Sequence, residues 1–130
     1  MSSSEPVVPP PGPAPIGPYT PVVRAGDLLF VSGQLGTVDG ALVAGGVGPQ
    51  VTAVLANLAA VLGSAGATLD QVVKTTVFLT DMADYEAMNA AYLAGFGTHR
   101  PARSAVAVVA LPRGAQVEIE AVAHLAPVTD

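Results

Sequence analysis

The stretch that decides the fold is "HRPARSAVAVVALPRGAQVEIEAVAHL", residues 99–125. It consists mostly of Ala, Val, Leu and Ile, and Pro112 and Gly114 divide it into two parts. Apolar runs bounded by Pro and Gly are typical of strands. We therefore predict two strands, in "ARSAVAVVAL" and "QVEIEAVAHL", that pair as a hairpin.

The charged side chains within these strands require an explanation. In the second strand, alternation puts Glu118 and Glu120 on one face and small apolar residues on the other, so a solvent-exposed face accounts for both glutamates. A hairpin symmetric about Arg113 would place Arg103 and Glu118 on opposite faces and roughly 17 Å apart. We therefore predict that these two residues, if they act together, come from different subunits.

The patterns on either side complete one domain. "YTPVVR" and "DLLFVSGQ" flank a turn at residues 25–27 and predict a hairpin. Apolar residues follow helical spacing over residues 47–63, and "QVVKTTVFLTD" is rich in β-branched residues. A second helix follows Asp81 or Asp84 and ends at Gly97. The order β-β-α-β-α-β-β predicts an α+β fold, with two helices packed on one mixed sheet.

Proline content separates the N-terminus from this domain. Residues 1–15 contain six of the twelve prolines. Because proline fixes φ and lacks an N–H, we predict a flexible, proline-rich tail over 1–15 and a folded domain over 16–126.

The composition restricts the function. Apolar residues make up 51% of the chain and charged residues 12%, which favours burial of part of the surface against copies of itself. The net charge of −5 disfavours nucleic-acid binding. The absence of Cys excludes disulfides and thiolate nucleophiles. We recognise no secretory signal and no apolar run near the roughly 18–20 residues that span a bilayer, so a cytoplasmic protein without membrane contact is expected.

Several polar residues have both a structural and a functional interpretation. Arg103 is either a surface arginine or a planar fork that grips a carboxylate. Tyr19 is a packing residue or part of a pocket, and Asn89 is a helix-surface amide or a ligand. His99 and His124 lack partners at metal-ligand spacing, so no metal site is expected. "SGQLG" is not a phosphate-binding loop, because no "GK[ST]" follows.

Four strings together resemble one family. "IGPYTPVV", "LLFVSGQLG", "VVKTTVFLTDMADYEAMNAAY" and "RPARSAVAVVALPRGAQVEIEAVA" are similar to motifs of the Rid family, also called YjgF or RidA. The similarity covers about residues 14–125. It implies a chorismate-mutase-like fold, a homotrimer with active clefts between subunits, and hydrolysis of 2-imino acids and enamines such as 2-aminoacrylate to 2-oxo acids and ammonia. The implied substrate is a small imino or enamino acid, and no cofactor is required.

The resemblance also assigns roles to residues. Arg103 of "PARS" corresponds to the arginine that holds the substrate carboxylate, and Glu118 of "VEIEA" to the acid that activates water. Tyr19 of "GPY" corresponds to a pocket-wall tyrosine near the imine. The substrate-binding positions are the backbone of Ser32 and Gly33, the side chain of Asn89, and backbone groups around Ala105.

The chain departs from the family pattern in two places. Ala105 stands where many relatives have Cys, which removes a thiol but leaves the backbone available. The loop over residues 36–46 is short and glycine-rich, which is expected to alter substrate size preference. Three alternatives remain open: a non-catalytic, chaperone-like or carboxylate-binding trimer, a pathway-specific deaminase of a larger enamine, and a ribonuclease. The ribonuclease fits the acidic charge poorly.

Overall fold

The structure is a computed structural model and describes residues 4–6 and 17–125. The main sheet contains β1 (Ser4–Pro6), β2 (Val22–Ala25), β3 (Leu28–Leu35), β6 (Val72–Leu79), β7 (Ala102–Ala107) and β8 (Val117–His124). The helices are α1 (Val47–Ser64) and α2 (Tyr85–Phe96), and a small ribbon contains β4 (Thr37–Val38) and β5 (Ala41–Leu42). Short 3₁₀ turns lie at η1 (Leu69–Gln71), η2 (Met82–Asp84) and η3 (Pro112–Gly114).

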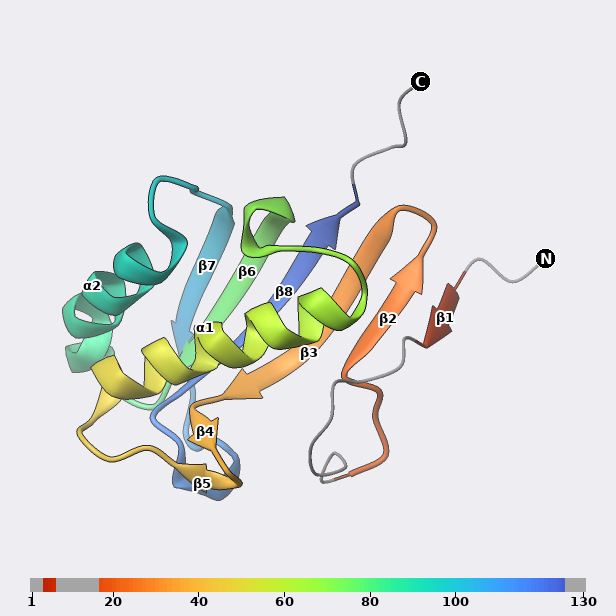
Figure 1. The fold of residues 1–130 in the computed structure, drawn as a ribbon. Helices are drawn as coiled ribbons and strands as arrows, with labels where there is room; N and C mark the ends of the chain where they lie inside the picture. The colour runs from red at the N-terminus through yellow and green to blue at the C-terminus, as the bar shows by residue number, and fades with distance from the viewer. Residues whose placement is uncertain (1–3, 7–16, 126–130) are drawn as a thin grey trace.

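The architecture is two layers, with both helices on one face of a mixed sheet (Figure 1). The strand order is β1-β2-β3-β8-β6-β7, in which β6 and β7 run parallel and the other neighbours antiparallel. The predicted α+β class, with two helices on one mixed sheet, is confirmed. Among the described elements no helix covers the second face of the sheet, which we call the open face.

The predicted hairpin of the last two strands is wrong. β6 lies between β7 and β8 and pairs with both. The reason is the α2 crossover, which returns the chain to the starting end of β6 and therefore makes β7 parallel to it. Residues 108–116 then carry the chain past β6, and β8 inserts between β6 and β3. Alternation along a strand predicts its two faces but not its partners.

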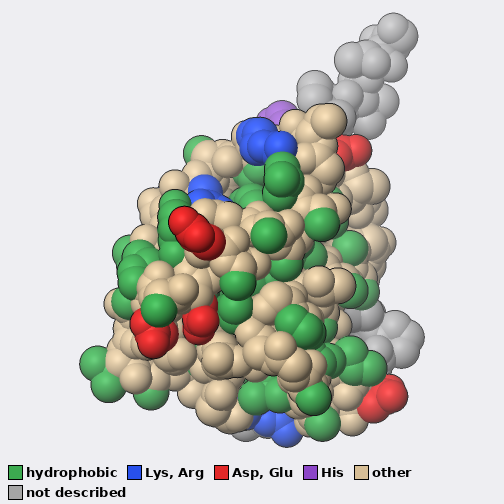
Figure 2. Space-filling view, turned by 90° about the vertical axis from the view of Figure 1, so that its left-hand side faces the viewer, with side chains coloured by type: hydrophobic (Ala, Val, Ile, Leu, Met, Phe, Trp, Pro, Cys, Tyr) green, Lys and Arg blue, Asp and Glu red, His purple; other side chains and the backbone are tan. Residues whose placement is uncertain are grey.

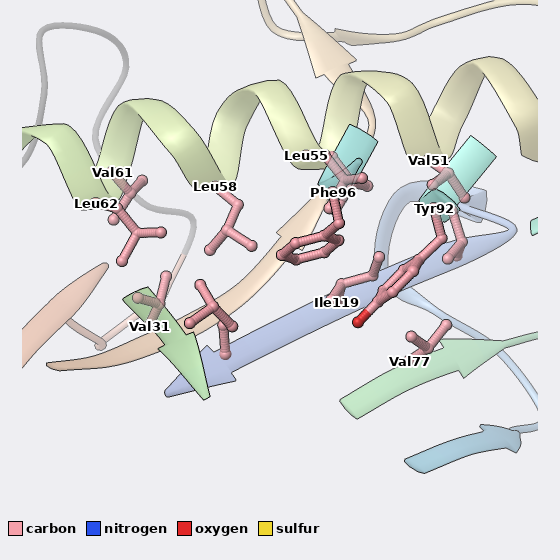
Figure 3. Packing of buried hydrophobic residues seen from close by; sticks show 14 of the residues in the cluster. Val31, Val51, Leu55, Leu58, Val61, Leu62, Val77, Tyr92, Phe96 and Ile119 are labelled. Atoms are coloured by element: carbon pink, nitrogen blue, oxygen red, sulfur yellow. The ribbon is translucent and has the colours of Figure 1, made fainter. Parts of the chain in front are cut away.

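The core lies between α1 and the sheet (Figure 3). Leu55, Leu58 and Leu62 of α1 point toward the strands, where Val77 and Ile119 are fully buried. Helix α1 has 18 residues and a mean hydropathy of 1.4, so by length and composition alone it could cross a membrane, contrary to the prediction of no such run. Half of it is buried inside this fold, as expected of a core helix.

The predicted N-terminal tail contains one element of regular structure. Ser4–Pro6 form β1 and extend the sheet beyond β2, with Ser4 opposite Ala25. The other residues of the predicted tail, 1–3 and 7–15, lie outside the described residues, and its flexibility stays a prediction.

Hydrogen bonds hold the glycine-rich loop over residues 36–46 in place. The Asn57 side chain donates to the carbonyl oxygens of Leu35 and Thr37, each at 2.9 Å. Arg113 donates to the carbonyl of Gly40 at 2.9 Å. These bonds from α1 and from η3 tie the β4–β5 ribbon to the domain, so Arg113 has a structural contact in this chain.

Candidate functional site

Arg103 lies on the edge strand β7 and points to the helix side of the sheet. It is opposite Thr75, which is fully buried under α2. Its guanidinium carbon lies 4.8 Å from the centre of the Tyr92 ring and 5.6 Å from that of Tyr85. One nitrogen donates to the Tyr85 hydroxyl at 3.1 Å, and another lies 3.8 Å from the sulfur of Met88. The side chain therefore lies against one face of α2, where Tyr85 and Tyr92, with Met88 between them, form what we call the aromatic cradle.

The positive charge of Arg103 has no acidic partner among the described residues. Its neighbours are two phenol rings and a thioether, which are neutral. A half-buried guanidinium with neutral contacts retains donors for an incoming anion, and its planar fork matches a carboxylate. The position is therefore chemically suited to bind a carboxylate.

The free edge of β7 supplies backbone groups beside this arginine. The N–H of Val108 donates to the carbonyl of Leu79 at 2.7 Å. Because groups alternate along a parallel ladder, the N–H and C=O of Arg103 and Ala105 point away from β6. The side chain of Ala105 packs against the core. Ala105 can therefore offer its backbone, but not its side chain, to a ligand at this edge.

Asn89 lies one turn beyond Tyr85 on α2. Its side-chain oxygen is buried and has no hydrogen-bond partner among the described residues. A buried acceptor without a donor costs free energy, so such a group calls for a partner. Asn89 of α2 therefore lies at the same end of the molecule as Arg103 and Ala105 of β7, because these two elements are neighbours there (Figure 1). Hydrophobic side chains cover much of this side, with several acidic side chains among them (Figure 2).

Glu118 lies on the open face of the sheet, on β8. It is opposite Phe78 of β6 and Leu35 of β3. Burial raises the pKa of its carboxyl group, and repulsion from Glu120 adds to that rise. A carboxylate with a raised pKa is suited to accept and return a proton near neutral pH.

Gly33 makes room for the Glu118 carboxylate. A Cβ atom at position 33 would lie 2.2 Å from the carboxylate oxygen and 2.6 Å from the carboxyl carbon of Glu118. The glycine is therefore required for the close approach of the Glu118 side chain to the β3 backbone, and not for an unusual φ. Its missing side chain leaves room for the Glu118 carboxylate beside the β3 backbone.

We expect Gly33→Ala to fold but to displace the Glu118 carboxylate. The clashing atoms belong to the far end of a flexible side chain, which can rotate away. Catalysis that depends on this carboxylate should fall about tenfold, since misplacement of a reacting group by about 1 Å is costly. Turnover and melting temperature, compared with Gly63→Ala on the exposed side of α1, test this. If turnover of Gly33→Ala were unchanged, the close contact between Gly33 and the Glu118 carboxylate would have no role in catalysis.

The raised pKa of Glu118 predicts a pH-dependent stability. The folded state binds this proton more tightly than the unfolded chain, so its contribution falls as pH rises from the ordinary value of 4.5 through the raised pKa. Glu118→Gln should therefore melt at a higher temperature than wild type at pH 7, and the difference should shrink below about pH 4.5. Glu120→Gln, which removes only the repulsion and keeps the Glu118 carboxyl group, should raise the melting temperature at pH 7 by less. A lower melting temperature for Glu118→Gln at pH 7 would contradict this expectation.

Tyr19 and Ser32 belong to the segment that leads into the sheet beside Gly33. The Ser32 hydroxyl donates to the carbonyl of Thr20 at 2.7 Å, and its N–H donates to the carbonyl of Pro21 at 2.9 Å. The Tyr19 side chain is 50% exposed. Ser32 therefore anchors the Tyr19 segment to β3, while the Tyr19 ring faces solvent in the single chain.

The structure does not bring Arg103 and Glu118 together. Arg103 pairs with Thr75 and Glu118 with Phe78, so they are three positions apart along β6 and on opposite faces of the sheet. With β6 between their strands, their Cα atoms are separated by roughly 14 Å. The predicted opposite faces are correct, but the predicted register is wrong because the hairpin does not exist. One chain therefore contains two separate candidate half-sites, one at Arg103 and one at Glu118.

The aromatic cradle of Arg103 is missing from the sequence-based prediction. The pattern of Tyr85, Met88 and Tyr92 indicates an apolar helix stripe and shows no relation to the arginine. Their spacing of three and four residues does place them on one helix face. What the pattern lacks is the parallel placement of β7 next to α2, which only the crossover creates.

Comparisons with known proteins agree with this fold and these motifs. Residues 11–125 match the family described as Endoribonuclease L-PSP. The mouse 2-iminobutanoate/2-iminopropanoate deaminase is 45% identical over 117 residues, with 88% of this chain and 87% of that protein covered. A Rid-family protein of unknown function from Yersinia pestis has a TM-score of 0.87 at 40% identity, covering 94% of this chain and 99% of that one.

A third relative has a bound amino acid. The structure of TdcF from E. coli with bound serine has a TM-score of 0.87 at 34% identity, covering 94% of this chain and 99% of that one. Similarity at this level over nearly the whole length covers both half-sites and the sheet between them. The two-layer architecture is thus the chorismate-mutase-like fold of these proteins. The chain belongs to the Endoribonuclease L-PSP family, which is the Rid family.

Proposed function

We propose that this protein is a hydrolytic deaminase of 2-imino acids and their enamine tautomers, which it converts to 2-oxo acids and ammonia. The observation that carries the proposal is Arg103, a guanidinium without an acidic partner among the described residues, beside the free backbone of an edge strand. Relatives of this chain named 2-iminobutanoate/2-iminopropanoate deaminase support it.

Arg103 would bind the substrate carboxylate through two parallel hydrogen bonds. The backbone groups of Ala105 that point away from β6 would then lie near the imine carbon and nitrogen. The unpaired oxygen of Asn89 would accept a hydrogen bond at the rim of the same pocket. The serine bound to TdcF supports recognition of a small molecule with an α-carboxylate by this fold.

Glu118 would activate water. As its carboxylate removes one proton from water, the water oxygen bonds to C2 of the imine and the electrons of the C=N double bond move to nitrogen. Glu118 gives this proton to the nitrogen, which completes a carbinolamine. Glu118 then takes the hydroxyl proton as the C=O group forms, and passes it to the nitrogen as the C–N bond breaks and ammonia leaves. The hydrolysis consumes one water and requires no redox step.

Assembly would join the two half-sites. Glu118 lies on the open face, where Phe30 and Val106 are 46% and 43% exposed and Val73 is 46% exposed. Burying this apolar face against another copy is favourable. We infer a homotrimer, in which the open face of one subunit meets the β7 edge of its neighbour and brings Glu118 toward the neighbour's Arg103. Tyr19 would close the wall of this shared cleft.

The acidic composition argues against the ribonuclease activity in the family's description. The net charge is −5, and Lys and Arg number five against ten Asp and Glu. Binding RNA depends on neutralising phosphates with basic side chains. The contacts of Arg103 among the described residues are neutral side chains, which fits one small anion instead.

The test is release of 2-oxo acid from imines made in situ by an amino-acid oxidase, across amino acids of increasing side-chain size. Acceleration by the protein over the spontaneous rate would establish the deaminase and rank its substrates. No acceleration for any imine in the panel would reject the proposed function.

A further inference from the structure

The hydroxyl of Tyr85 makes a direct contact with the Arg103 guanidinium. The Nη2 atom of Arg103 donates to this oxygen at 3.1 Å, and the guanidinium carbon lies 5.6 Å from the ring centre. None of the similarities above assigns Tyr85 a role. Its contact is nevertheless made to the one group on which the proposed carboxylate recognition depends.

The two tyrosines around Arg103 are held differently. The hydroxyl of Tyr92 shares a buried hydrogen bond of 2.7 Å with Thr75, so its ring is a fixed platform. Tyr85 is 38% exposed, and its hydroxyl has Arg103 as its partner among the described residues. It is the first residue of α2, directly after the turn that Asp81 caps by accepting from the N–H of Ala83 at 2.9 Å. The helix start thus positions Tyr85 over the arginine.

The contact leaves enough donors for a substrate. A guanidinium has five N–H donors. One is directed to Tyr85 and one to the sulfur of Met88, so three remain, and a bidentate carboxylate needs two. Tyr85 can therefore keep its hydrogen bond while a carboxylate is bound. Since Met88 and Tyr92 offer weak or ring contacts, the Tyr85 hydroxyl is the strongest directional restraint on the guanidinium plane.

We propose that Tyr85 is a positioning residue that orients the Arg103 guanidinium for the substrate carboxylate. The inference rests on the proposed function, because it takes Arg103 as the carboxylate site. Restricting the rotation of a long side chain before binding reduces the entropy lost when the ligand binds. The gain in binding free energy is the same in the ground state and in the transition state. The contact therefore lowers KM rather than raising kcat.

Tyr85→Phe keeps the ring and removes the hydroxyl, so it is the decisive variant. We expect KM for the imino acid to rise about fivefold to tenfold, the cost of ordering one long side chain on binding, with kcat within about twofold of wild type. Leu93→Ala, an exposed α2 residue, is the control and should leave both constants unchanged. Arg103→Lys lacks the Nη2 atom that contacts Tyr85. In that background, Tyr85→Phe should cause no further change in KM.

Binding without turnover separates this inference from the proposed function. Calorimetry with 2-oxobutanoate should show the same fivefold to tenfold weakening for Tyr85→Phe, and 2-oxobutanamide, which lacks the charge, should show none. If the wild type binds 2-oxobutanoate but hydrolyses no imine, the proposed function fails while Tyr85 is still tested by binding. Equal KM and Kd in wild type and Tyr85→Phe, a loss of kcat alone, or no 2-oxobutanoate binding by wild type would overturn the inference.

Discussion

Arg103→Ala is expected to lower kcat/KM for imine hydrolysis by about 10³-fold, which follows from the loss of two charge-assisted hydrogen bonds of about 2 kcal/mol each. The substitution removes a guanidinium that lies in the aromatic cradle of Tyr85 and Tyr92 without an acidic partner in the described part of the chain. Without it the substrate loses both affinity and the orientation of its C=N bond toward the attacking water.

The fold should survive this change. Arg103 is on an edge strand, and its partners Tyr92 and Met88 keep their own core contacts. The measurement is steady-state release of 2-oxo acid, with size-exclusion chromatography to verify that assembly is unchanged. Arg24→Ala, which removes an exposed arginine from β2, is the matched control and should retain full activity. Activity of Arg103→Ala close to that of the control would remove the carboxylate clamp from the mechanism.

Glu118→Gln is expected to reduce kcat by about 10²–10³-fold while leaving the affinity for 2-oxobutanoate within about threefold. The amide has nearly the shape of the carboxylate and can still lie across Gly33, so binding geometry is kept. It cannot accept the proton of the attacking water. The loss should therefore appear in turnover and not in binding.

The pH profile adds an independent test of the same residue. Because the ionised form is the base, kcat/KM of the wild type should rise with pH through the raised pKa of Glu118 and then level off. Glu120→Gln should lower that pKa slightly, because repulsion from Glu120 contributes to the rise, and should shift the rising limb to lower pH. A Glu118→Gln protein that retains turnover, or that retains the rising limb, would assign water activation to another group.

The buried carboxylate of Glu118 is expected to increase turnover but to lower the stability of the fold. Burial of its carboxylate against Gly33 disfavours the charged form, which is why the glutamine variant is expected to be the more stable protein at pH 7. The same burial raises the pKa toward the range in which a base can both take and return a proton. A group that costs stability and lies in a tight contact is typical of a functional site.

The secondary structure could be predicted from the sequence because its signals are local. Helix α1 follows from apolar spacing over one helix face, and the end of α2 at Gly97 follows from its positive φ of 65°. The alternation in β8 correctly placed Glu118 and Glu120 on one face. The motifs around Arg103 and Glu118 identified the family, and the comparisons confirm it.

The partners of these residues were decided by tertiary structure alone. The neighbour of β8 is β6 and not β7, because the α2 crossover turns β7 parallel to β6. That one pairing places Arg103 beneath Tyr85 and puts the free edge of Ala105 beside it. The approach of Gly33 to Glu118 likewise joins residues far apart in the chain. Local periodicity determined each strand and its faces, whereas strand order, register and contacts across the sheet depend on long-range packing that no short segment encodes.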